Sequence, residues 1–166
     1  EILRCLVGSE MCIRDRYYND LWLTNICFLT GGEKMNVIML LKHKDSLKYI
    51  YEDNTLRQGL EKMRAHSYTA IPVITRDGKY VGTVSEGDFL WHIIDKKTSG
   101  DIEEQEEFRI RDILRPDFNP AVKISVGMDE LLARAMNQNF IPVTDDLGTF
   151  IGIVTRQDII RYFVNK

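Results

Sequence analysis

The sequence predicts a mixed α/β fold of the α+β type, in which two tandem repeats each run strand, helix, strand, strand, helix. One block of 20 residues recurs 70 positions later without a gap. In each copy, two short apolar segments flank a turn that contains Asp and Gly, as paired strands do. Ahead of each block, apolar residues recur at i, i+4 and i+7, the spacing of one helix face. A fixed spacing of this kind indicates two copies of one structural unit.

The repeated block reads IPVITRDGKYVGTVSEGDFL at residues 71–90 and IPVTDDLGTFIGIVTRQDII at residues 141–160. Seven positions are identical, which is far beyond chance in so short a window. They are Ile71, Pro72, Val73, Gly78, Gly82, Val84 and Asp88, which recur as Ile141, Pro142, Val143, Gly148, Gly152, Val154 and Asp158.

The first copy begins with a short extended segment at 48–51, and Leu56, Leu60 and Met63 then mark a helix. Strands are expected at 71–74 and 79–84, with Asp77-Gly78 as the turn between them. Ser85 then opens a second helix, which runs through Asp95. The expected elements of the second copy are an extended segment at 121–125, a helix with Met128, Leu132 and Ala135, strands at 140–144 and 149–154, and a helix from Thr155.

The first helices of the two copies are offset by 72 residues and the strands by 70, so the second copy has a deletion of two residues between helix and strand. The predicted repeats cover 35–95 and 110–166, and a charged linker covers 96–109. One copy of about 60 residues would bury too little apolar surface to be comfortably stable. We therefore expect the two copies to form one module with a pseudo-twofold axis and a shared core.

Residues 1–34 show no periodicity that continues into the repeats, and we expect them to be non-native. The string CLVGSEMCIRDR resembles translated sequencing-adapter sequence. The four residues before Met35, GGEK, require purine-rich codons of the form of a bacterial ribosome-binding site. Met35 is therefore the expected start of the protein. The alternative is a genuine N-terminal extension that serves as an interaction arm.

Composition excludes several classes of function. The formal net charge of -3 argues against a nucleic-acid partner, which would favour a basic face. No apolar run approaches the roughly 20 residues of a membrane span. All three cysteines lie in residues 1–34, and their absence from the repeats fits a reducing cytoplasm. The histidines lack metal-ligand spacing, and no nucleophile has a plausible base nearby. We expect neither a metal site nor an enzyme.

The two copies resemble the cystathionine-β-synthase (CBS) domain family from about Met35 to Lys166. The resemblance rests on the IPV strand and on the junctions GTVSEGD (82–88) and GIVTRQD (152–158), which follow the pattern Gly-x-x-Ser/Thr-x-x-Asp. It implies a pseudo-twofold pair that binds adenosine-containing ligands in clefts between the repeats. The chain also looks like the stand-alone bacterial CBS proteins, some of which bind cyclic di-AMP.

In the reading that this resemblance implies, Asp88 and Asp158 accept hydrogen bonds from ribose hydroxyls. Ser85 and Thr155 offer hydroxyls at a helix N-terminus, where phosphate is favoured. Adenine would lie beside one of two apolar segments, which consist of Tyr68, Thr69, Ala70, Ile71 and Pro72 or of Phe140, Ile141 and Pro142. Ser/Thr-x-x-Asp is also a capping-box pattern, so both motifs could instead only cap their helices.

The two copies differ in charge beside the motif. Arg156 lies between Thr155 and Asp158, whereas the matching residue in the first copy is Glu86. An arginine attracts phosphate and a glutamate repels it. We therefore expect the second copy to hold the more anionic part of a ligand and to bind it more tightly.

The sequence thus predicts a regulatory module that senses AMP, ADP or ATP, requires no cofactor, and signals to a partner protein that the sequence does not identify. One alternative is a cyclic di-AMP sensor of the same fold, and another is a scaffold without a ligand. A homodimer is expected through the helices that follow the two motifs, because their apolar residues exceed what one small core consumes. These residues are Phe89, Trp91, Ile94, Ile159 and Phe163.

Overall fold

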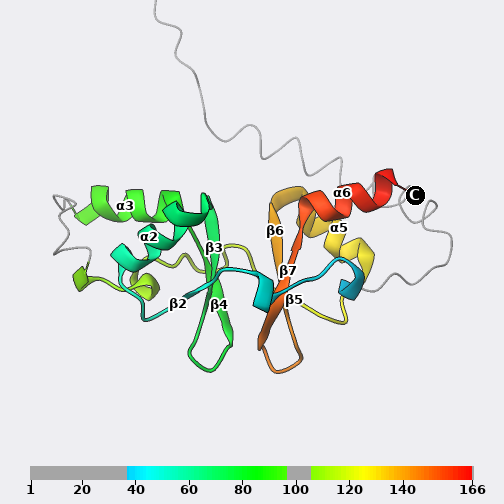
Figure 1. Cartoon of the computed structure of the whole chain (residues 1–166), viewed down its shortest axis with the longest axis horizontal. Coiled ribbons are helices and arrows are strands. Elements are labelled where there is room, and N and C mark those ends of the chain that lie inside the picture. Colours follow the sequence, from blue (N-terminus) through cyan, green and yellow to red (C-terminus); the bar gives the residue numbers. More distant parts are fainter. Residues whose placement is uncertain (1–36, 97–105, 166) are drawn as a thin grey trace, which may run out of the picture. The chain divides into compact units, whose positions relative to one another are not determined.

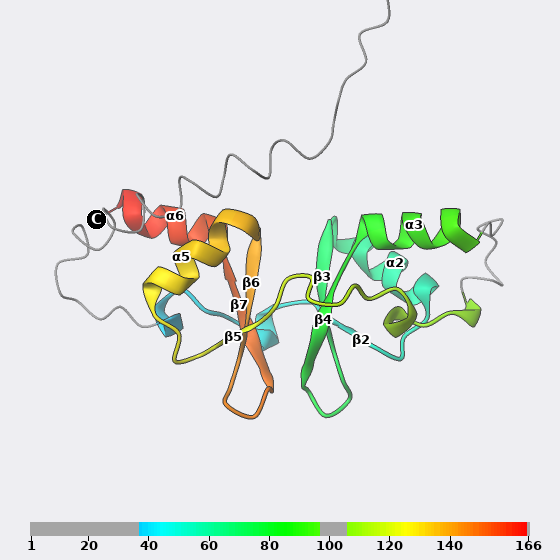
Figure 2. The ribbon, with the colours of Figure 1, turned by 180° about the vertical axis from the view of Figure 1, so that it is seen from behind.

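The computed structural model describes residues 37–96 and 106–165, which form two α/β repeats (Figure 1). The expected artefact at 1–34, the expected start at Met35 and residues 97–105 of the linker lie outside the described residues. Two views of the ribbon show α2 and α3 together beside one sheet, and α5 and α6 together beside the other (Figures 1 and 2).

Repeat 1 contains a three-stranded sheet in the order β2-β3-β4. Strand β2 pairs parallel with β3, and β3 pairs antiparallel with β4. The elements are β2 (Ile50–Tyr51), α2 (Leu56–His66), β3 (Ala70–Ile74), β4 (Tyr80–Ser85) and α3 (Glu86–Lys96). This is the predicted order of strand, helix, strand, strand, helix.

Repeat 2 has the same order, and its sheet gains a strand from a segment that the sequence assigns to repeat 1. The sheet order is β1-β7-β6-β5, and β1 (Lys42–His43) pairs antiparallel with β7. The other elements are β5 (Val122–Lys123), α5 (Met128–Asn137), β6 (Phe140–Thr144), β7 (Phe150–Thr155) and α6 (Arg156–Val164).

The 70-residue offset holds in the strand register. Pro72 is opposite Thr83 in one sheet, and Pro142 is opposite Ile153 in the other. The repeats also exchange reciprocal backbone hydrogen bonds. Tyr80 N donates to the Gly148 carbonyl at 3.1 Å, and Phe150 N donates to the Gly78 carbonyl at 2.8 Å. These bonds interconvert when each residue number changes by 70, as the predicted pseudo-twofold relation requires.

The predicted two-residue deletion has a structural basis at the end of the first helix of each repeat. In repeat 1, α2 is capped at its C-terminus by Ser67, which has left-handed backbone angles (φ 53°) and whose N–H bonds back to α2. In repeat 2, the C-cap residue of α5 is Gln138, which is in extended conformation with φ -121°. The chain there enters β6 directly and needs fewer residues.

The two repeats exchange the segments that lead into them. Val37, in the 3-10 helix η1 (Val37–Met39), is buried in the core of repeat 2. Conversely, Ile110 and Ile113, in and just after η3 (Ile110–Asp112), are buried in the core of repeat 1. The expected shared core is therefore two cores, each completed by a segment that the sequence assigns to the other repeat.

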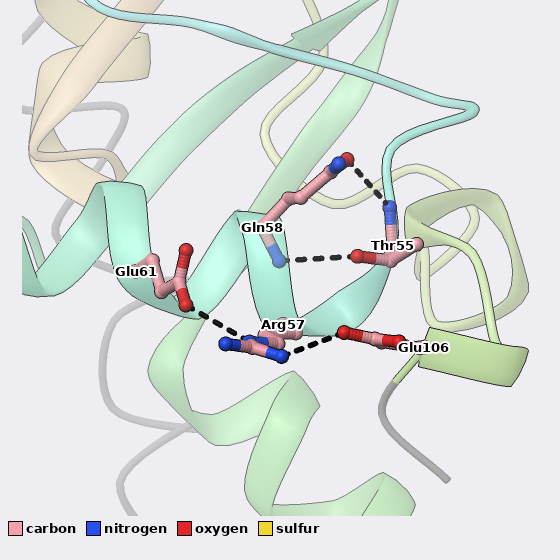
Figure 3. A network of polar contacts seen from close by, with 5 residues as sticks. All are labelled: Thr55, Arg57, Gln58, Glu61 and Glu106. Carbon is pink, nitrogen blue, oxygen red and sulfur yellow. Dashed lines mark hydrogen bonds and ion pairs between the residues drawn. The ribbon is translucent and has the colours of Figure 1, made fainter. Parts of the chain in front are cut away.

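The end of the predicted linker is docked on the start of α2 (Figure 3). The Arg57 guanidinium bonds Glu106 at 2.6 Å and Glu61 at 3.0 Å. Thr55 and Gln58 form a reciprocal capping box that starts the helix, with each backbone N–H bonded to the other side chain. Phe108, within the predicted linker, packs against the core of repeat 1, so residues 106–109 belong to that repeat in space.

The apolar side chains that α3 and α6 expose are not all those that the sequence predicted. Phe89 and Ile159, expected to exceed the needs of the core, are only 3% and 1% exposed and pack inside their repeats. The expected surplus is therefore wrong for these two residues. The large apolar side chains that α3 and α6 do expose are Leu90, Trp91, Ile94, Ile160 and Val164. Among the helices of residues 37–96 and 106–165, none combines the length and apolarity needed to cross a bilayer.

Candidate functional site

In each repeat, the sheet brings the Ser/Thr-x-x-Asp motif next to the segment expected to contact adenine. Ser85 pairs with Ala70 at one end of β3, and Thr155 pairs with Phe140 at the matching end of β6. The first amide of α3, at Glu86, donates to the Thr69 carbonyl at 3.1 Å. Residues that the sequence predicted as one site are therefore neighbours.

Within these segments, the side chains differ in accessibility. Ile71 and Ile141 are 0% exposed, and Pro72 and Pro142 are buried beside them. Their side chains fill the cores, so a bound base could meet only their backbone. Thr69 is exposed, and the half-buried side chains are those of Tyr68, Ala70 and Phe140.

In repeat 1, the Asp88 carboxylate is enclosed, with a side chain only 3% exposed. Its Oδ2 accepts hydrogen bonds from the Ser85 N–H and the Ser85 hydroxyl, both at 2.7 Å. Its Oδ1 lies 2.6 Å from Arg115 Nε. Arg115 also stacks its guanidinium over the Phe118 ring, 3.6 Å from the centroid. Both carboxylate oxygens of Asp88 therefore already have partners.

In repeat 2, the Asp158 carboxylate is more accessible, with a side chain 15% exposed. Lys42 Nζ lies 2.7 Å from its Oδ2, which also accepts the Thr155 hydroxyl, and Arg161 lies 3.8 Å from Oδ1. Burial alone raises the pKa of Asp158, but the hydrogen bonds from Lys42 and Thr155 and the two cationic charges outweigh it. The net result is a pKa below the usual value, so the carboxylate is charged at neutral pH.

Asp158 also lines a cavity of about 520 Å³. One wall is the segment that leads into repeat 1, from Met39 to Lys42, and the other is a face of α6. Residues 158, 161 and 162 contribute that face, and the C-cap residue Asn165 continues it at the spacing i, i+3, i+4, i+7 of one helix side. The volume is within the range of small-molecule sites, and the walls combine apolar side chains with a few charged groups.

Arg156 points elsewhere. Its Nε donates to the Gln138 carbonyl at 3.2 Å, at the end of α5. This bond commits one of the five donors of the guanidinium. The role of Arg156 toward phosphate therefore stays a prediction. Glu86, its counterpart, is exposed on α3.

The capping role of the motifs is also present in the structure. The Asp158 N–H donates to the Thr155 hydroxyl at 3.2 Å, and Thr155 is the N-cap of α6. In repeat 1, the Asp88 carboxylate instead accepts the N–H of Ser85. A cap and a ligand contact can use the same side chains, so these capping bonds are compatible with both the capping and the ligand-binding interpretation of the motifs.

The sequence interpretation missed three cations, Lys42, Arg115 and Arg161. Arg161 could have been found, because it lies three residues after Asp158 on the same helix and so on the same face. Lys42 reaches Asp158, and Arg115 reaches Asp88, because each repeat packs its first segment against the other repeat. The residue spacing within a repeat does not indicate this exchange.

The comparisons with known proteins agree with the fold of two repeats. The CBS domain model matches residues 42–95 and 110–165. An uncharacterised protein of Methanocaldococcus jannaschii is 31% identical over an alignment that covers 79% of this chain and 96% of that protein.

Solved structures share the fold. Listeria monocytogenes CbpB in complex with c-di-AMP is similar with a TM-score of 0.70 and 21% identity, over 78% of this chain and 95% of that chain. CBSX2 in complex with AMP is similar with a TM-score of 0.62 and 23% identity, over 78% and 96%. With the repeated motifs, the strand register and the match to the family model over both repeats, the chain belongs to the CBS domain family.

Proposed function

We propose that the chain is a regulatory module that senses an adenine nucleotide such as AMP, ADP or ATP and is not an enzyme. The observation that supports it most directly is that Asp158, the acid of the second repeated motif, lines a cavity of about 520 Å³ that also holds Lys42 and Arg161. A ribose diol needs an acceptor, a phosphate needs cations, and a base needs apolar walls. All three kinds of group are present around this cavity.

The two repeats are proposed to be unequal, with repeat 2 the tighter site. Asp88 is 3% exposed and holds Arg115 on one oxygen and Ser85 on the other. A ribose that approaches it must displace Arg115 from a carboxylate that is almost fully enclosed. Asp158 is five times more exposed, at 15%, and already borders a cavity. The ranking is the one expected from Arg156, but it is supported by the accessibility of the acids.

A thermal-shift and calorimetry panel with AMP, ADP, ATP and c-di-AMP tests the function. A ligand at 100 times its dissociation constant should stabilise the chain by about 2.7 kcal/mol. Asp158→Ala should abolish the tighter binding event, and Asp88→Ala should affect a weaker one. If no adenine ligand shifts the melting temperature, the scaffold reading is favoured. Equal losses in the two variants would contradict the ranking.

Cyclic di-AMP is the second candidate ligand. A solved CBS protein of similar fold, CbpB, is in complex with c-di-AMP. Lys42 and Arg161 would be available to meet a second phosphate. In the same panel, a dissociation constant for c-di-AMP well below that for AMP would identify the chain as a sensor of this dinucleotide.

We further propose a homodimer through α3 and α6, and a signal that changes how this dimer meets an unidentified partner protein. The expected contact surface is the exposed apolar set of these helices, in which Trp91 is 60% and Val164 77% exposed. Light scattering should give the mass of a dimer at micromolar concentrations, and Trp91→Glu should shift it toward the monomer. A monomeric wild type would contradict this proposal.

A further inference from the structure

The cavity beside Asp158 brings together two segments that are far apart in the sequence. Lys42 belongs to β1, whose backbone pairs with Ile153 of β7. Asp158 lies in the first turn of α6, directly after β7. Because β1 is held on the same strand that leads into α6, the lysine is fixed next to the acid by backbone pairing.

Lys42 and a ribose would compete for one carboxylate. Lys42 Nζ lies 2.7 Å from Asp158 Oδ2, and the Thr155 hydroxyl donates to the same oxygen. A ribose hydroxyl that binds Asp158 there must take the place of the ammonium group. The displaced ammonium then needs another anion, and Lys42, which is 45% exposed at its side chain, has room to move.

We propose that Lys42 is the residue that makes this site prefer a nucleotide to a nucleoside, an inference that rests on the proposed function. Lys42 and Asp158 form an ion pair in the structure. When a nucleotide binds, the ribose takes Asp158 and the phosphate takes Lys42, so every charge keeps a partner. A nucleoside takes Asp158 but offers no anion, so the ion pair is broken without compensation.

Other cations near the motifs are less suited to this role. Arg156 is bonded to the Gln138 carbonyl, away from Asp158. Arg161 also faces Asp158, but at 3.8 Å, and it is 61% exposed at its side chain. Lys42 makes the shorter contact and lines the same cavity.

The experiment measures AMP and adenosine binding by calorimetry in the wild type, Lys42→Gln, Lys42→Arg and Arg156→Gln. Lys42→Gln should weaken AMP by about tenfold, the value of one charge-assisted contact. The same change should leave adenosine unchanged or strengthen it by up to about fivefold, because the competing ion pair is gone. Lys42→Arg should keep the preference for AMP, and Arg156→Gln tests the competing prediction that Arg156 meets the phosphate.

The opposite effects on the two ligands separate this role from a structural one. If Lys42→Gln weakens AMP and adenosine by the same factor, Lys42 only supports the fold and the inference is wrong. If Arg156→Gln removes the preference and Lys42→Gln does not, the phosphate lies near Arg156 and the inference is again wrong. If the wild type binds AMP, ADP, ATP and c-di-AMP not at all, the proposed function itself fails. Urea unfolding of each variant confirms that the compared proteins are folded.

Discussion

Gly152→Ala should detach β1 from the sheet of repeat 2. A Cβ at Gly152 would lie 2.1 Å from the Lys42 carbonyl oxygen and 3.2 Å from His43 Cα. Both atoms are backbone, so no side-chain rotation can relieve the clash, and the two strands must separate locally. The β1–β7 pairing and the packing of the leading segment on the core of repeat 2 would be weakened. Overpacking of this kind typically costs about 1–3 kcal/mol.

Gly82→Ala is the matched control, because Gly82 is the equivalent glycine of repeat 1. There the nearest atom to the new Cβ is Leu114 Cδ2 at 3.3 Å, the end of a flexible side chain. We expect a cost below about 1 kcal/mol, since one small rotation provides the space. Urea denaturation followed by circular dichroism compares the two variants. Equal free energies of unfolding would refute the argument that β1 is held closely on Gly152.

Three further predictions concern the core, the contact between repeats and acid stability. Ile110→Ala should lower the free energy of unfolding by about 2–5 kcal/mol in a chemical denaturation. The reason is that Ile110 follows the linker in the sequence but is fully buried in the core of repeat 1. Tyr80→Phe should cost about 1 kcal/mol by the same measurement, because the hydroxyl donates to the Asn119 carbonyl at 2.7 Å. Asp158 has a lowered pKa in the folded state, so its charged form stabilises the fold above the unfolded pKa of about 3.9, and this contribution is lost as the pH falls through the folded value. As the pH falls from 5, the urea midpoint of Asp158→Asn should therefore decrease less than that of the wild type. Equal decreases would exclude a contribution of the Asp158 charge to acid stability.

The strand register could be predicted from the sequence because it depends on local rules. Side chains alternate across a strand, so a repeated IPV segment and a repeated glycine place Pro72 and Pro142 at equivalent positions. The helix faces were less predictable. The run Phe89-Leu90-Trp91 is apolar at every position, and its pattern does not indicate which side faces inward. The structure buries Phe89 and leaves Leu90 and Trp91 about half exposed.

The partners of the two acids could not be predicted for a different reason. Comparison of the repeats matches each residue with its counterpart 70 or 72 positions away, and it treats each repeat as a closed unit. The cation on Asp158 comes from the start of the predicted repeat 1, and the cation on Asp88 comes from the start of the predicted repeat 2. At the 72-residue offset of the first helices, the counterpart of Lys42 is Leu114 and not Arg115. The two cations therefore do not occupy matching positions.

This mismatch gives the two sites different chemistry even though their motifs are the same. Arg115 binds an enclosed carboxylate through Nε and is stacked on an aromatic ring, so its displacement would leave Asp88 buried without a counterion. Lys42 binds a carboxylate at the edge of a cavity, where an arriving phosphate can replace Asp158 as its partner. The difference between the repeats therefore lies in the exchanged segments, and variants of Lys42 and Arg115 should change ligand binding while the Ser/Thr-x-x-Asp motifs stay intact.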